Sequence, residues 1–121
     1  MGENRIKLVA ADMDGTLLNR ERKITKYTQN VIKKAMAQGV YFVPATGRAV
    51  NALPPELKEM EGIRYGIFSN GATIYDLKEE KVIYKNHFEM DRVLELMDFL
   101  KQFDLMESIS LNGQSYANKK E

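Results

Sequence analysis

The stretch IKLVAADMDGTLL, residues 6–18, decides the fold predicted for this chain. Its first part, Ile6 to Ala11, is nearly all apolar and alternates only weakly. That pattern is typical of a strand buried on both faces of a parallel sheet. The apolar run stops at Asp12, and Gly15 then allows the backbone to turn sharply. The sequence therefore predicts a buried strand with acidic residues at its carboxyl end.

A helix and a second strand follow this first strand. Residues Thr25 to Gln38 have apolar side chains at helical spacing, with Thr25 as the expected N-cap and Gly39 as the stop. Val40 to Val43 is predicted to be a short strand ended by Pro44. A helical stretch comes next. Pro54 and Pro55 interrupt it and are expected to restart the helix.

The third strand is predicted at Tyr65 to Ser69, and Asn70-Gly71 followed by Ala72 to Tyr75 and Val82 to Tyr84 indicates a turn and a hairpin. The order is thus βαβαβ followed by a small β element. Strands that alternate with helices imply right-handed crossovers and a parallel sheet, with ligands at the carboxyl ends of the strands. The fold class expected is α/β.

The rest of the chain is predicted to open a second αβ unit. Asp91 to Phe103 has an amphipathic helical pattern, and Ser108 to Leu111 and Ser115 to Ala117 flank Asn112-Gly113 as a hairpin. We place a domain boundary near Lys85 to Met90, which divides the chain into residues 1–85 and 86–121.

Composition narrows the classes of function. The 121 residues carry a net charge of +1 and contain no cysteine, which suits a reducing compartment and leaves no thiolate for chemistry. Without a basic cluster, binding to nucleic acid is disfavoured. The apolar runs are too short for a membrane span and no signal peptide is evident, so we expect a cytoplasmic protein.

Asp12 and Asp14 are the first candidates for chemistry. An extended Asp-x-Asp directs both carboxylates to the same side, so that one can attack or bind a metal while the other transfers protons. The alternative is a loop in which aspartate forms a turn or caps a helix. Spacing alone leaves the two interpretations open.

The run from Asp12 to Leu18, DMDGTLL, resembles the first motif of the haloacid dehalogenase (HAD) superfamily. The resemblance implies a Rossmann-like core in which Asp12 is the nucleophile that forms an aspartyl-phosphate and Asp14 is the general acid and base. It also implies a Mg²⁺ ion held by the Asp12 side chain and the main-chain carbonyl of Asp14. Such a cation would offset the repulsion between carboxylate and phosphate.

Thr46-Gly47-Arg48, after the second strand, is similar to the second motif of the superfamily. By this resemblance Thr46 would hold a phosphoryl oxygen. The Gly47 amide would add a donor, and Arg48 could make a forked contact with an anionic substrate. Taken alone, Thr46 would more simply cap the next helix.

Ser69-Asn70-Gly71-Ala72 resembles the Cof-type subgroup, whose cap domain follows the third strand. Asn70 could contact substrate there, although Asn-Gly is also the commonest hairpin dipeptide and a simple turn is the favoured reading. His87, the only histidine, is interpreted as structural or solvated because no metal-ligand partner lies near it in the sequence.

The family also needs a lysine and further acidic residues located after the cap. This chain ends at Glu121, within what should be an early hairpin of the cap, and neither Lys119 nor Lys120 is assigned as that lysine. We therefore expect a truncated, N-terminal portion. The neighbours of the first strand would then be missing, so Ile6 to Ala11 should form an exposed edge, which predicts self-association, instability or dependence on the missing segment.

The expected function is that of a Mg²⁺-dependent phosphatase for a small phosphorylated metabolite such as a sugar phosphate, weak or inactive as this chain. One alternative is a non-catalytic or regulatory protein that keeps an anion pocket. Another is a phosphomutase or a phosphonatase-like enzyme on the same scaffold. A response-regulator-like phosphoacceptor is disfavoured, because nothing upstream of Asp12 supplies its acidic pair.

Overall fold

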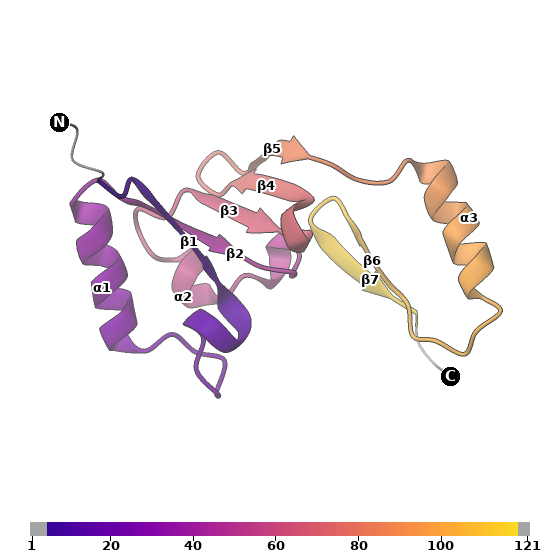
Figure 1. Ribbon diagram of the computed structural model, residues 1–121, viewed down its shortest axis with the longest axis horizontal. Helices are drawn as coiled ribbons and strands as arrows, with labels where there is room; N and C mark the ends of the chain where they lie inside the picture. Colours follow the sequence, from indigo (N-terminus) through magenta and orange to yellow (C-terminus); the bar gives the residue numbers. More distant parts are fainter. Residues whose placement is uncertain (1–4, 119–121) are drawn as a thin grey trace.

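A computed structural model describes residues 5–118 (Figure 1), and Lys119 and Lys120 lie outside this range. In chain order the elements are β1 (Leu8–Asp12), η1 (Met13–Leu17), α1 (Lys26–Ala37), β2 (Tyr41–Ala45), η2 (Val50–Ala52), α2 (Pro55–Lys58), β3 (Tyr65–Phe68), η3 (Ser69–Gly71), β4 (Thr73–Asp76), β5 (Lys81–Lys85), α3 (Met90–Leu100), β6 (Ser108–Leu111) and β7 (Gln114–Ala117). The predicted βαβαβ order is confirmed.

Strands β1 to β5 form one sheet in sequence order. The first three strands run parallel, whereas β4 and β5 extend the sheet as an antiparallel hairpin. Parallel pairing places the carboxyl ends of β1, β2 and β3 at one edge of the sheet. The predicted polar motifs follow these three ends, so the topology gathers them in one place.

The core lies where the sheet meets η1, α1 and the segment around α2. Its buried members come from all of these elements and are Met13, Leu18, Ile24, Ile32, Phe42, Leu53, Leu57, Met60, Ile63 and Phe68. Met13, Leu57 and Phe68 are fully inaccessible to solvent. Because Met13 lies between the two aspartates, the core anchors the loop that carries them.

Helix α1 begins and ends where the sequence predicts. The Thr25 hydroxyl accepts a hydrogen bond from the Thr28 amide at 3.2 Å, as an N-cap does. Beyond the helix, Gly39 has a φ of +85°, a conformation that favours glycine, and its amide donates to the Met36 carbonyl. The chain can therefore reverse directly into β2.

The prediction that Pro44 ends the second strand is wrong, because β2 continues to Ala45. The Tyr41 amide donates to Lys7 beside β1 and the Thr46 amide donates to Ile67 in β3. The backbone amides of successive strand residues point alternately to the two neighbouring strands, so the amide position of residue 44 faces β3. Strand β2 pairs with β3 at one position only, and its ladder with β1 does not need the amide that proline lacks.

The prediction that β1 is buried on both faces is wrong. The strand lies mostly exposed at the edge of the sheet. Leu8 is 54% exposed. The strand is paired on one side only, with β2, which agrees with the expectation of an unpaired edge. An exposed apolar edge of this kind can pair with another strand.

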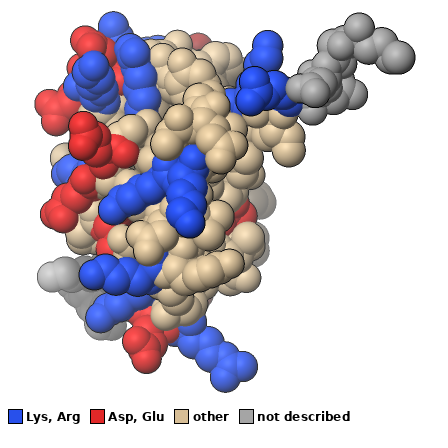
Figure 2. Space-filling view, turned by 90° about the vertical axis from the view of Figure 1, so that its left-hand side faces the viewer, with Lys and Arg blue, Asp and Glu red and all other residues tan. Residues whose placement is uncertain are grey.

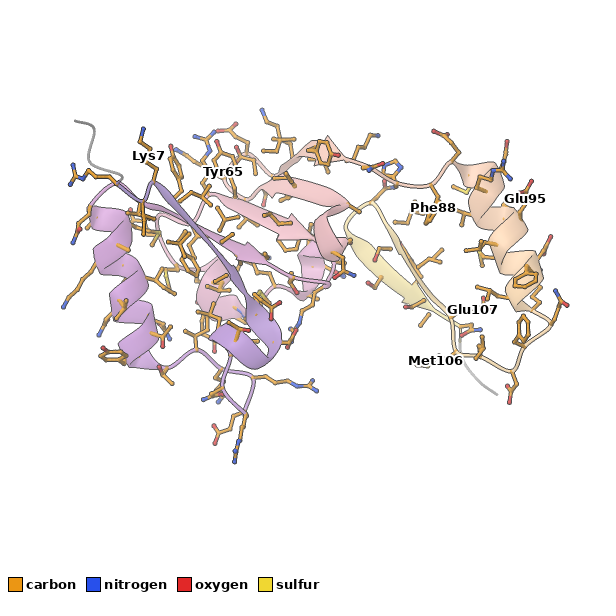
Figure 3. All side chains as sticks on the ribbon, in the orientation of Figure 1. Lys7, Tyr65, Phe88, Glu95, Met106 and Glu107 are labelled. Atoms are coloured by element: carbon orange, nitrogen blue, oxygen red, sulfur yellow. The ribbon has the colours of Figure 1, made fainter. Side chains whose placement is uncertain are left out.

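Helix α3 stands apart from the five-stranded sheet, at the far end of an extended segment after β5 (Figure 1). It has no buried residue, and Phe88 before it and Met106 after it are each 73% exposed (Figure 3). Strands β6 and β7 form a separate two-stranded sheet. Residues 86–118 thus follow the predicted order of helix and hairpin, while the boundary near Lys85 to Met90 stays a prediction.

The surface carries both signs of charge. On the face shown in Figure 2, Lys and Arg side chains are interspersed with Asp and Glu side chains and with uncharged residues. His87 is exposed, as one of its two interpretations expected. None of the helices within residues 5–118 is long and apolar enough to cross a membrane.

Candidate active site

The carboxyl end of β1 presents Asp12 and Asp14 to solvent. Both residues are exposed, whereas Met13 between them is fully buried. A tight turn follows, in which Gly15 has a φ of +79° and the Leu18 amide donates to the Met13 carbonyl. The Thr16 hydroxyl donates to the Asp12 carboxylate at 3.1 Å. The turn thus fixes one Asp12 oxygen, a role for Thr16 that spacing in the sequence did not indicate.

Thr46 follows the end of β2, next to the end of β1. Asp12 is opposite Ala45 in the parallel register, so Thr46 is one residue beyond this pair. The residue is buried, with 6% exposure, and its hydroxyl accepts a hydrogen bond from the Arg48 amide at 3.1 Å. It is not the N-cap of a helix, because η2 begins later, with Ala49 in that position. Its hydroxyl hydrogen is still able to donate to an anion.

The turn after β3 is hydrogen-bonded to the Thr46 turn. The Ser69 amide donates to the Arg48 carbonyl at 2.9 Å, and the Asn70 amide donates to the Thr46 carbonyl at 3.1 Å. Ser69, Asn70 and Gly71 all have positive φ values, of 50°, 55° and 93°. Two consecutive non-glycine residues in this region are uncommon in proteins. The third predicted motif is therefore held against the second by its backbone.

Arg48 makes a forked ion pair with Asp14. Its Nη2 lies 2.6 Å from Oδ1 and its Nε lies 2.9 Å from Oδ2. The Arg48 hydrogen bond, together with the charges of Arg48 and Arg22, holds the pKa of Asp14 below its ordinary value despite some desolvation. The sequence predicted this fork for an anionic substrate. In the structure it holds the neighbouring catalytic candidate instead, and contact with substrate stays a prediction.

An open groove of about 620 Å³ adjoins Arg48. Its walls are the loop Glu21–Lys23 on one side and the segment from Asn51 to Glu56 on the other. The Asn19 side chain braces this loop, because it accepts hydrogen bonds from the amides of Glu21 and Lys23. Arg22 lines this groove, and its charge also helps to lower the pKa of Asp14, an effect that no spacing in the sequence indicated.

The oxygen donors at the site are of the kind that Mg²⁺ prefers. Asp12 offers an exposed carboxylate, and Asp14 offers a main-chain carbonyl in addition to its side chain. Mg²⁺ usually keeps several waters and takes only one or two carboxylates from the protein. Within residues 5–118, no group of three or more His, Cys, Asp or Glu side chains comes together as a metal site. The described residues therefore fit one part of a magnesium site.

Comparison with known proteins matches residues 9–121 to the haloacid dehalogenase-like hydrolase family. The chain belongs to this family of HAD hydrolases. A solved HAD phosphatase from Bacteroides thetaiotaomicron superposes with a TM-score of 0.81 at 29% identity, covering 99% of this chain and 44% of that one. The Rossmann-like fold and the resemblance to the Cof-type subgroup are thereby confirmed.

Relatives of known sequence agree with this assignment. A protein of Buchnera aphidicola (subsp. Schizaphis graminum) is 39% identical over 115 residues, which are 93% of this chain and 41% of the relative. A 5-amino-6-(5-phospho-D-ribitylamino)uracil phosphatase of Bacillus subtilis is 37% identical over 89 residues, 70% of this chain and 36% of the relative. This HAD chain therefore spans about two fifths of the length of the proteins it matches.

Proposed function

We propose that this chain supplies the nucleophile and the general acid and base of a Mg²⁺-dependent phosphatase. The observation that carries the proposal is the position of Asp12. Its carboxylate is exposed at the end of β1 and is fixed through one oxygen by Thr16, and the residue itself pairs with Ala45, which directly precedes Thr46. Family membership makes phosphate ester hydrolysis the reaction best supported for this constellation.

In the proposed reaction the Asp12 carboxylate attacks phosphorus and the bond to the leaving oxygen breaks. That oxygen takes a proton from Asp14 and departs as an alcohol, which leaves an aspartyl-phosphate. Asp14, now ionised, removes a proton from water, and the water oxygen attacks phosphorus to release phosphate and restore Asp12. The Thr46 hydroxyl and the Gly47 amide are assigned as donors to the phosphoryl oxygens.

The ion pair with Arg48 bears on both roles of Asp14. A carboxylate that accepts two hydrogen bonds from a guanidinium is held in its ionised form, which suits the removal of a proton from water. Protonation of the leaving oxygen requires the other form of Asp14. We therefore assign the described arrangement to the base step, and expect Arg48 to release at least one Asp14 oxygen for the acid step.

The Asp12 carboxylate and the Asp14 main-chain carbonyl would hold Mg²⁺, so that Asp14 would serve both the metal and the proton transfers. The Mg²⁺ ion would neutralise part of the negative charge that the nucleophile and the phosphate bring together. The remaining ligands are assigned to parts of the longer protein, since residues 5–118 bring no third acidic ligand to this point. For the same reason we expect this chain alone to hydrolyse phosphate esters weakly or not at all.

The proposed substrate is a small phosphorylated metabolite, such as a sugar phosphate, handled in the cytoplasm. Support comes from the Bacillus subtilis relative, a phosphatase named for a substrate that carries a phosphorylated ribityl group. The open groove beside Arg48 offers space for a small molecule. Binding of nucleic acid is not proposed, because the net charge is only +1.

The test compares phosphate release from an aryl phosphate with Mg²⁺ for the wild type and for Asp12→Asn, in this chain and in the longer reading frame. We expect turnover in the longer protein that Asp12→Asn abolishes. Equal activity of both would refute Asp12 as nucleophile. The second candidate, a non-catalytic anion-binding protein, is favoured by the incomplete metal site among residues 5–118. Phosphate binding without turnover in the longer protein would establish it.

A further inference from the structure

The tip of the β6–β7 hairpin contacts the core next to the Thr46 turn. The Asn51 amide, in η2, donates a hydrogen bond to the Gly113 carbonyl at 3.2 Å. A Cβ atom placed on Gly113 would lie 3.4 Å from the Cβ and Cγ2 atoms of Val50. Figure 1 shows this turn of the hairpin beside the core, although the rest of residues 86–118 lies away from it. Two segments far apart in the sequence meet at this point.

The backbone at the hairpin tip has the shape of a tight Asn-Gly turn. Asn112 and Gly113 have φ values of +51° and +77°, which a two-residue hairpin of this kind requires. A side chain at position 113 would be strained by this φ, and its Cβ would meet Val50 at ordinary van der Waals distance. The docked tip therefore depends on glycine for its backbone conformation.

Segment η2 is in turn bonded to Arg48. The Arg48 Nη1 atom donates to the Ala52 carbonyl at 3.2 Å, while its Nε and Nη2 atoms donate to the Asp14 carboxylate. One guanidinium thus bridges η2 and Asp14. The side chains of Arg48 and Asp14 are 28% and 53% exposed, so solvent competes for these bonds and the orientation of the guanidinium depends on its partners.

We infer that the hairpin tip positions Asp14 through η2 and Arg48. The contacts form one series: Gly113 to Asn51, η2 to Arg48, and Arg48 to Asp14. With the tip docked, the Ala52 carbonyl is held in place and the guanidinium is directed at the carboxylate. With the tip displaced, η2 is free to shift and Arg48 loses one of its three anchors. The catalytic meaning of this inference rests on the proposed function of Asp14. The contacts are present in the structure whatever that function is.

The test measures hydrogen exchange at two labelled positions of this chain by NMR: the Asn51 backbone amide and the Arg48 Nε–H. Two variants disturb the contact: Gly113→Val strains the positive-φ backbone at the tip, and Val50→Ala removes both methyl groups of the side chain nearest to position 113. The matched control is Gly39→Val, which changes another positive-φ glycine that has no neighbour within 4 Å of its would-be Cβ.

We expect both groups to exchange slowly in the wild type, and the two contact variants to speed exchange at Asn51 and at Arg48 by about threefold to tenfold, the range for loss of one hydrogen bond. Gly39→Val should leave both rates unchanged. Two results would overturn the inference: a fast Asn51 amide in the wild type, or faster exchange at Asn51 with no change at Arg48. Neither readout involves turnover, so a failure of Asp12 as nucleophile would be recognised separately.

Discussion

Asn70 Oδ1 lies 2.8 Å from the position that a Cβ atom would occupy on Gly47. The side chain of the third predicted motif is thus in contact with the backbone of the second. This contact explains why residue 47 is glycine although its φ requires none, since a methyl group there would displace the Asn70 amide. The two turns at the ends of β2 and β3 form one unit.

Gly47→Ala should therefore displace the Asn70 side chain and reduce phosphate binding, with a stability loss of about 1 kcal/mol from the forced shift. The check is a titration of the longer protein with inorganic phosphate, together with chemical denaturation. Asn70→Gly in the Gly47→Ala background removes the clash and should restore the stability. If Gly47→Ala binds phosphate as tightly as the wild type, the Thr46–Arg48 turn is not the anion site.

Arg48→Lys tests whether the arginine positions Asp14 or binds substrate. Lysine keeps the positive charge but cannot make the forked pair with both Asp14 oxygens. If Arg48 positions Asp14, kcat should fall by up to about 100-fold with little change in KM. A rise in KM at constant kcat would support the contact with an anionic substrate that the sequence predicted. Steady-state kinetics of the longer protein separates the two results.

Asp76 is expected to make the stability of the fold sensitive to acid. Burial raises the pKa of this side chain, but the amides of Glu79 and Lys78 and the guanidinium of Arg64 outweigh it, so the pKa lies below the ordinary value of 3.8. A lowered pKa in the folded state means that the stabilisation is complete above the unfolded value and is lost as the pH falls through the folded value.

The measurement is thermal unfolding of the wild type and of Asp76→Asn across the acidic range. Wild-type Tm should fall below about pH 4, near the unfolded pKa of an aspartate. Asp76→Asn should have a lower Tm at neutral pH, and its Tm should change less with acid. A difference between the two proteins that is the same at every pH would show that Asp76 acts only through its shape.

The sequence was sufficient to predict most of the fold, because its signals are local. The Thr25 cap, the Gly39 stop and the Asn112-Gly113 turn each depend on a few neighbouring residues, and all three lie where they were expected. The end of β2 is not predicted correctly from Pro44, because the effect of a proline depends on which neighbouring strand its missing amide hydrogen would face. That direction is set by register, which the composition of one strand does not reveal.

The candidate site likewise combines features that depend on local sequence with features that depend on distant residues. Asp12 and Thr46 were found from motifs and lie at neighbouring strand ends, as predicted. The partner of Arg48 was missed, because 34 residues separate it from Asp14 and either an acid or a substrate can occupy a guanidinium fork. The contact between Asn51 and Gly113 joins residues 62 positions apart through backbone atoms, and backbone atoms leave no trace in side-chain composition.

The exposed edge of β1 should make this chain self-associate. Leu8 and Val9 are exposed, and β1 is paired on one side only, so a second chain can add a strand there.

Leu8→Lys places a charge on this edge and should reduce association, since a lysine would have to be desolvated in a strand-to-strand contact. Sedimentation velocity over a range of concentrations measures the effect. The control is Val31→Lys, which changes an exposed apolar residue of α1 and leaves β1 unaltered. Equal reduction by both substitutions would indicate general hydrophobic association, and a wild type that stays monomeric at high concentration would show that the edge is blocked in some other way.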